Sequence, residues 1–223
     1  MTWVKICGTT NTRDARMSVA AGADALGFIF TPSPRQVDVA QAADIVAALS
    51  SEVETIGVFV NETPQRVEEI VVRVGLTGVQ LHGEESAESL PEFRRALGQR
   101  KIIKTLQAGE ILNASKGGVA AYLAECGSID AILLDSGSLT RRGGTGATFP
   151  WKEAASLAAA IQAAVPLIVA GGLKPENVSD ALRILNPWGV DVVSGVESGL
   201  GTKDDVKLRD FVAAVRRAQV ATP

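Results

Sequence analysis

Polar side chains and glycines stand at or just after the ends of most short apolar runs in this sequence. In chain order they are Lys5, Cys7, Arg35, Asn61, His82, Asp135, the pair Gly171-Gly172 and the pair Ser194-Gly195. Thiol, imidazole and carboxyl groups exchange protons, an arginine can hold a carboxylate, and glycines let backbone N–H groups approach an anion. These residue types predict a ligand site wherever the fold brings the ends of the runs together.

The apolar runs are eight in number and rich in β-branched residues, covering residues 4–7, 25–30, 55–60, 77–81, 101–105, 130–134, 166–170 and 189–193. Most are too uniformly apolar for a sheet with one solvated face, so they predict parallel strands that are buried on both sides. Helical stretches alternate with them, including an alanine-rich one at 154–164. Thr63-Pro64 and Lys174-Pro175-Glu176-Asn177 carry the residue types of helix starts.

Spacing favours a particular architecture. The runs recur about every 26 residues, which suits right-handed βαβ crossovers, and eight such units make a closed (β/α)₈ barrel. An open doubly wound sheet is the alternative, but it would leave shorter or more polar edge strands, and none of the eight runs has that character. No Gly/Ser-rich linker divides the chain. We therefore predict an α/β protein with a single-domain barrel over residues 1–223.

The composition and charge of the chain indicate which class of ligand it binds. The chain has 223 residues, of which 46% are hydrophobic and 21% charged, and a net charge of −3 without blocks of like charge. This balance predicts a folded protein that binds a small molecule rather than nucleic acid or a membrane surface. No apolar run reaches a membrane-spanning length and no signal-peptide stretch is present, so we expect a cytoplasmic protein. The sequence leaves its oligomeric state open between monomer and homodimer.

The sequence offers little support for a metal site. The two cysteines, Cys7 and Cys126, are far apart, and His82 is the one histidine, so no zinc site is expected. By residue type alone, a cysteine at the end of an apolar strand is most often a small buried hydrophobe. Cys126 is interpreted in that way, as a packing residue on a helix. A lone acid such as Asp135 is about as often a loop or cap residue as a catalytic one.

As a set, eight segments resemble the phosphoribosylanthranilate isomerase family, the (β/α)₈ enzymes of tryptophan biosynthesis. They appear in the family's order between residues 5 and 197. The segments are Lys5-Ile6-Cys7-Gly8, Ser33-Pro34-Arg35, Gly57-Val58-Phe59-Val60-Asn61, Gln80-Leu81-His82-Gly83, Leu133-Leu134-Asp135, Gly143-Gly144-Thr145-Gly146, Ala170-Gly171-Gly172-Leu173 with Pro175-Glu176-Asn177-Val178, and Ser194-Gly195-Val196-Glu197.

The resemblance implies an Amadori rearrangement of a phosphorylated small molecule without cofactor or metal. It implies that Cys7 is the general base and Asp135 the general acid. A thiol is mostly protonated at neutral pH, and Lys5, which shares a sheet face with Cys7, is expected to activate it. Asp135 must hold its proton, so we expect its pKa to be raised.

Further residues are expected to hold the substrate. Arg35 suits the anthranilate carboxylate, or stabilises charge that moves into the aromatic amine. His82 could either contact substrate or serve the structure of its loop. The predicted phosphate site consists of Gly171, Gly172, Ser194 and Gly195, because the loops after the last two strands form the usual phosphate site of this fold. The segment Gly143-Gly144-Thr145-Gly146 lacks the ending of a nucleotide P-loop and is expected to form a flexible lid.

Three departures from the family pattern concern affinity more than reaction type. They are Gln36 in place of an aromatic, Val193 in place of a common serine, and the turn Ser198-Gly199-Leu200-Gly201. Two alternatives stay open. One is a histidine-pathway phosphoribosyl-amine isomerase, which uses a carboxylate pair and is disfavoured by the cysteine in the first strand. The other is a catalytically silent barrel that binds a phosphorylated metabolite.

Overall fold

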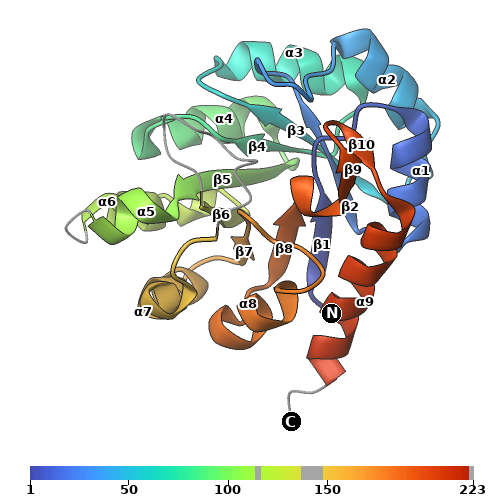
Figure 1. Ribbon diagram of the computed structural model, residues 1–223. Helices are drawn as coiled ribbons and strands as arrows, with labels where there is room; N and C mark the ends of the chain where they lie inside the picture. The colour runs from blue at the N-terminus through green and yellow to red at the C-terminus, as the bar shows by residue number, and fades with distance from the viewer. Residues whose placement is uncertain (114–116, 137–147, 221–223) are drawn as a thin grey trace.

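Eight parallel strands close into a barrel in this computed structural model, which describes residues 1–113, 117–136 and 148–220 (Figure 1). Each strand pairs with the next one along the chain, and β1 closes the ring by pairing with β8. The strands are β1 (Trp3–Ile6), β2 (Ala25–Ile29), β3 (Glu54–Phe59), β4 (Gly78–Leu81), β5 (Lys101–Gln107), β6 (Ala131–Asp135), β7 (Leu167–Val169) and β8 (Gly189–Val192). The predicted barrel is confirmed. The open sheet is wrong, because each of these eight strands has a neighbour on both sides.

Helices surround the barrel, and within the described residues none is both long and apolar enough to cross a bilayer. They are α1 (Thr12–Ala20), α2 (Val39–Ala47), α3 (Pro64–Val74), α4 (Leu90–Leu97), α5 (Ala108–Asn113), α6 (Gly117–Ala124), α7 (Trp151–Gln162), α8 (Val178–Leu185) and α9 (Asp205–Val220). Three short 3₁₀ helices occupy Ala87–Ser89, Cys126–Ser128 and Ser194–Val196. Cys126 thus starts a 3₁₀ turn rather than lying on an α-helix, and it packs against the core.

The two predicted helix starts have different outcomes. Thr63 caps α3 as expected, with its hydroxyl accepting a hydrogen bond from the backbone N–H of Arg66 at 3.2 Å. Helix α8 begins at Val178, three residues beyond Pro175. The reason is that the Asn177 side chain folds back on the preceding loop. It accepts from the N–H of Lys174 at 2.9 Å and donates to the carbonyl of Gly172 at 2.9 Å.

Inward and outward side chains alternate along the strands and create two cores. In β1, Val4 and Ile6 join the large core between strands and helices, whereas Trp3 belongs to the smaller cluster inside the barrel. Lys5 also points inward, where it meets Gln80 of β4 across the barrel. The barrel is therefore apolar near the strand starts and polar towards their carboxyl ends, where a site can form.

A short antiparallel hairpin near the end of the chain was not expected. It consists of β9 (Glu197–Gly199) and β10 (Thr202–Lys203), and Leu200 and Gly201 connect the two strands. Figure 1 shows it above the carboxyl ends of β1 and β8, next to α1. The segment that the sequence indicated as an unusual turn is thus the tip of this hairpin.

Candidate active site

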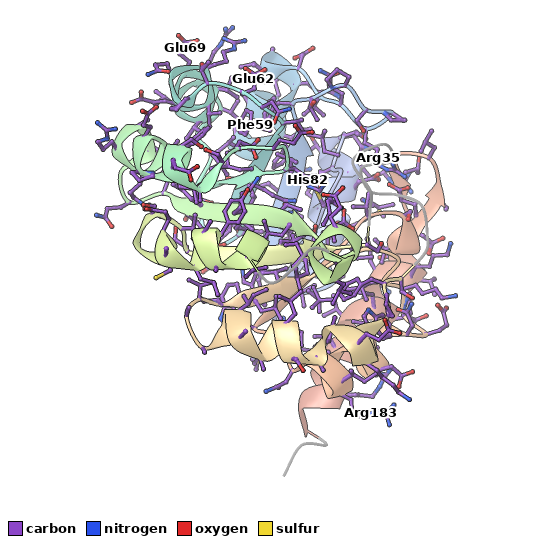
Figure 2. All side chains as sticks on the ribbon, turned by 90° about the vertical axis from the view of Figure 1, so that its left-hand side faces the viewer. Arg35, Phe59, Glu62, Glu69, His82 and Arg183 are labelled. Carbon is purple, nitrogen blue, oxygen red and sulfur yellow. The ribbon has the colours of Figure 1, made fainter. Side chains whose placement is uncertain are left out.

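A cavity of about 570 Å³ opens at the carboxyl ends of the strands. Cys7, which follows β1, and Asp135, which ends β6, both border it although they are 128 positions apart. Arg35 from the loop after β2 and His82 from the loop after β4 also border it (Figure 2). Among the predicted phosphate residues, Gly171, Gly172 and Ser194 do so as well. The barrel therefore brings the predicted thiol and carboxyl group to one space.

Cys7 is held tightly in place by its neighbours. Its backbone N–H donates to Val192 of β8 at 2.9 Å, and its carbonyl accepts from the Lys203 ammonium at 2.7 Å. The side chain is only 4% exposed. Gly27 of β2 makes the room that the thiol occupies, because a Cβ at that position would lie 2.5 Å from the Cys7 sulfur. A glycine in β2 is thus required by the thiol.

The charges around Cys7 oppose one another. Burial raises the pKa of its thiol, the Lys5 ammonium lowers it, and the Asp191 carboxylate raises it again, so the net pKa lies above its usual value. Lys5 is in the predicted position and lowers the pKa of the thiol as expected, but burial and the Asp191 carboxylate together outweigh this effect. The Lys5 ammonium is also paired with Asp191 at 3.0 Å. Its own pKa is raised, because Asp191 and Cys7 outweigh the effect of burial.

Asp135 has His82 as its neighbour. The Nε2 atom of His82 lies 3.5 Å from Oδ2 of Asp135, and the Asp135 side chain is 5% exposed. On the other edge of the ring, Nδ1 of His82 lies 2.9 Å from the amide nitrogen of Gln80. His82 therefore borders the cavity and contacts both the proposed acid and Gln80 of its own segment.

The loop that carries His82 is fastened by a buried ion pair. Lys104 of β5 donates from its ammonium to Glu85 at 2.6 Å and to the carbonyl of Gly83 at 2.8 Å. Glu85 also accepts from the backbone N–H of Gly83 and, at 2.9 Å, from that of Asn61. Sequence reasoning missed this pair. Its only signal was an acid in the His-Gly-Glu-Glu segment and a lysine in an apolar strand.

Arg35 has a protein partner in this structure. Its Nε and Nη2 atoms donate to the two carboxylate oxygens of Glu197 at 2.7 and 2.6 Å. Lys203 lies 3.2 Å from the same carboxylate. The pKa of Glu197 is lowered, because these two cations outweigh the effect of burial. The pair uses two of the five N–H donors of the guanidinium and leaves Nη1 outside it. Glu197 and Lys203 were given no role from the sequence.

The glycines of the predicted phosphate site differ in whether they border the cavity. Gly171 and Gly172 have φ values of +82° and +64°, which favour glycine, and both border the cavity. Gly195 does not border it. A Cβ there would overlap the carbonyl oxygen of Leu173, so this glycine lets the loops after β7 and β8 approach each other. The segment Gly143-Gly144-Thr145-Gly146 lies outside the described residues.

Two of the three departures from the family pattern lie at the cavity. Val193 borders the cavity, and so does Leu200, whose side chain at the hairpin tip is 69% exposed. Gln36 is exposed and does not border it. The change at Val193 and the change at the hairpin are therefore both placed to affect a bound ligand, whereas Gln36 is not.

Comparison with known proteins identifies relatives of this site. A family model described as N-(5'phosphoribosyl)anthranilate (PRA) isomerase matches residues 4–214. A protein of Geobacter sulfurreducens named N-(5'-phosphoribosyl)anthranilate isomerase is 44% identical over 220 residues, which are 98% of this chain and 99% of the relative. A protein of Desulforudis audaxviator with the same name is 43% identical, over 98% of this chain and 100% of that one.

Solved structures agree in fold. Phosphoribosyl anthranilate isomerase from Thermotoga maritima superimposes with a TM-score of 0.83 at 34% identity, over 97% of this chain and 100% of that chain. A second structure of a phosphoribosyl anthranilate isomerase contains reduced 1-(o-carboxyphenylamino)-1-deoxyribulose 5-phosphate. It superimposes with a TM-score of 0.80 at 34% identity and the same coverage.

Proposed function

Since this chain belongs to the N-(5'-phosphoribosyl)anthranilate isomerase family, we propose that it converts N-(5'-phosphoribosyl)anthranilate into 1-(2-carboxyphenylamino)-1-deoxyribulose 5-phosphate. This is an isomerisation of tryptophan biosynthesis. The observation that carries the proposal is the meeting of Cys7 and Asp135 over one cavity that two glycines of the loop after β7 also border. Such a pair offers one proton acceptor and one proton donor.

The two groups have separate steps. Asp135 gives its proton to the ribose ring oxygen, the bond between that oxygen and C1′ breaks, and the nitrogen lone pair forms a Schiff base with C1′. The Cys7 thiolate then removes the proton from C2′, and the electrons of that C–H bond neutralise the iminium as an enolamine. The enolamine becomes the ketone when its hydroxyl gives a proton to the Asp135 carboxylate and C1′ takes a proton from the Cys7 thiol. Both groups thereby return to their starting states, and no step is assigned to a cofactor or metal.

Substrate groups are assigned to the rest of the cavity. Gly171, Gly172 and Ser194 supply the phosphate site, in keeping with the position of such sites in this fold, and Gly195 contributes by bringing the two loops together. Arg35, held by Glu197, presents Nη1 to the anthranilate carboxylate. Leu200 and the strand residues Val58 and Leu133 offer apolar surface to the aromatic ring.

The proposal also covers the location of the protein, its number of domains and its oligomeric state. We place the protein in the cytoplasm as one domain over residues 1–223, acting as a monomer or homodimer on a phosphorylated small molecule. A solved relative from Thermotoga maritima is described as dimeric. The proposal includes no nucleic-acid or membrane partner.

The test is the loss of substrate fluorescence with purified protein. We expect turnover of phosphoribosylanthranilate, and a loss of about 10² to 10⁴-fold in Cys7→Ser and in Asp135→Asn, because general acid–base groups contribute that much. Cys126→Ser is the matched control, because Cys126 lies outside the cavity, and it should keep full activity. A Cys7→Ser variant as fast as the parent would remove the proposed base. Turnover of the histidine precursor alone, or binding without turnover between pH 6 and 9, would favour the alternatives.

A further inference from the structure

Gln80 connects the two halves of the site through the inside of the barrel. It lies on β4 and is 1% exposed. Its carbonyl oxygen accepts from the Lys5 ammonium at 2.8 Å. Its amide nitrogen lies 3.1 Å from the hydroxyl of Thr105 and 2.9 Å from Nδ1 of His82. The mechanism above gives Gln80 no role, although it stands between the cation beside the thiol and the histidine beside the acid.

Lys5 determines which way round this amide stands. An ammonium group only donates hydrogen bonds, so the atom of Gln80 that faces it must be the oxygen. The reversed amide would set N–H groups against the ammonium and leave a fully buried cation without this acceptor, which is costly. The NH₂ group therefore faces His82 and Thr105.

This orientation has a consequence for the imidazole. The amide N–H of Gln80 can donate to Nδ1 of His82 only if Nδ1 carries no proton. In a neutral imidazole the proton is then on Nε2, the nitrogen that lies 3.5 Å from Oδ2 of Asp135. We propose that Gln80 is a positioning residue that holds His82 as its Nε2–H tautomer and so aims an N–H donor at Asp135.

The benefit to the proposed acid lies in the placement of its proton. An N–H directed at Oδ2 makes that oxygen an acceptor, so the proton that Asp135 transfers is carried on Oδ1. The opposite tautomer would turn a lone pair of Nε2 towards Oδ2 and draw the acidic proton away from the substrate. This step rests on the proposed function, whereas the tautomer itself is a property of the free protein.

The tautomer can be observed directly, because His82 is the only histidine of the chain. The ¹⁵N spectrum of histidine-labelled protein at about pH 8, where an imidazole is ordinarily neutral, distinguishes Nδ1–H from Nε2–H. We expect the Nε2–H form in the parent. A parent spectrum of the Nδ1–H form, or of an even mixture, would overturn the proposal whether or not the protein is active.

Substitution tests the cause. In Gln80→Glu a carboxylate oxygen replaces the donor, so Nδ1 of His82 should become protonated. Gln65→Glu makes the same change on the exposed side of α3 and should leave the spectrum as in the parent. If Gln80→Glu does not fold, Gln80→Met removes the donor without adding a charge and should give both tautomers. A spectrum unchanged from the parent in a folded Gln80 variant would show that Gln80 does not select the tautomer.

Activity supplies a separate measurement. In Gln80→Glu, kcat should fall about ten-fold or more, within the range that general acid catalysis contributes, while KM changes less than three-fold. An unchanged kcat together with a changed tautomer would overturn the catalytic part of the inference. Failure of the proposed function looks different, because the parent itself would then not turn over the substrate.

Discussion

The protonation of the Cys7 thiol is set by burial together with two neighbouring charges. Burial disfavours the thiolate most, Lys5 favours it, and Asp191 both pairs with Lys5 and repels a second negative charge, so the pKa of the thiol is raised. The proposed base is therefore a thiol in the free protein at neutral pH. Asp191 serves the fold by compensating a buried cation and at the same time limits the strength of the base.

The raised pKa of Cys7 predicts an activity that rises with pH. Only the thiolate can take the C2′ proton, and a raised pKa means that this form gains population only above the ordinary thiol value of about 8.5. We expect kcat/KM to be still rising at that pH. A titration of the thiolate absorbance in a Cys126→Ser background should show the same midpoint. A midpoint below 8 would contradict this prediction.

Removing the charge of Asp191 should shift the pKa of Cys7 downwards. In Asp191→Asn the repulsion is lost and Lys5 has the Cys7 thiolate as its remaining anionic partner, so the thiolate titration should move to lower pH. Because the variant also breaks a buried ion pair, we expect about 3 kcal/mol less stability in denaturant unfolding. Asp210→Asn on α9, a surface change of the same kind, is the control. A thiol midpoint that stays or rises would show that Asp191 does not limit the base.

Among the elements, strand β2 has a glycine where it lies against Cys7, the residue that follows the neighbouring strand β1. Gly27 pairs with Ile56 of β3, so the strand continues through this position, yet a side chain here would meet the Cys7 sulfur. The requirement comes from the barrel, where β1 and β2 are neighbours, and not from any turn in the backbone.

Gly27→Ala should therefore disturb the thiol more than the strand. We expect kcat to fall at least ten-fold and the stability to fall by about 1–3 kcal/mol, the usual cost of overpacking. In Gly109→Ala on α5, no atom of the described residues, apart from the chain neighbours and the helix's own backbone, lies within 4 Å of the added Cβ, and activity should be kept. Steady-state kinetics and urea unfolding measure both effects. Full activity in Gly27→Ala would mean that the position of the sulfur is not critical.

At the scale of the whole molecule, one end of the barrel carries the candidate site and the other end carries stabilising contacts. At the end opposite the cavity, the rings of Trp3 and Trp188 stack with centroids 5.1 Å apart. The Lys101 ammonium lies 5.0 and 5.2 Å from the two ring centroids and 2.6 Å from Glu54. These residues stand at or just before strand starts, where barrels of this kind carry stability rather than chemistry.

Lys101→Met should separate stability from function. Loss of the cation–π contacts and of a partly exposed ion pair is expected to cost about 1 kcal/mol, which lowers the melting temperature by roughly 2–4 °C. The kinetic constants should stay within two-fold of the parent. Thermal unfolding followed by Trp fluorescence, together with the activity assay, measures both. A large change in kcat would contradict the division of the barrel into a stabilising and a catalytic end.

Local sequence pattern was enough to predict the fold, whereas the candidate site residues also required the resemblance to a known family. The ends of each of the eight strands lie within two residues of the ends of the apolar run that predicted it. A parallel strand that is buried on both faces consists almost entirely of apolar residues, so its own composition identifies it. The order of strands then followed from the short crossovers between them. Cys7, Asp135, Arg35 and His82 stand at or just after strand ends, which share one face of a barrel, but their roles were inferred from the resemblance to the family.

Pairing between distant residues was decided only by the tertiary structure. Lys5 meets Asp191 and Gln80, which are 186 and 75 positions away, and Arg35 meets Glu197 across 162 positions. Such contacts depend on strand register and on how far each side chain reaches into the barrel, and neither is encoded in a local pattern. The sequence therefore determined which groups are available for chemistry. The closed barrel decided their partners and, through these partners, their charge, because electrostatic interactions depend on distances in space rather than along the chain.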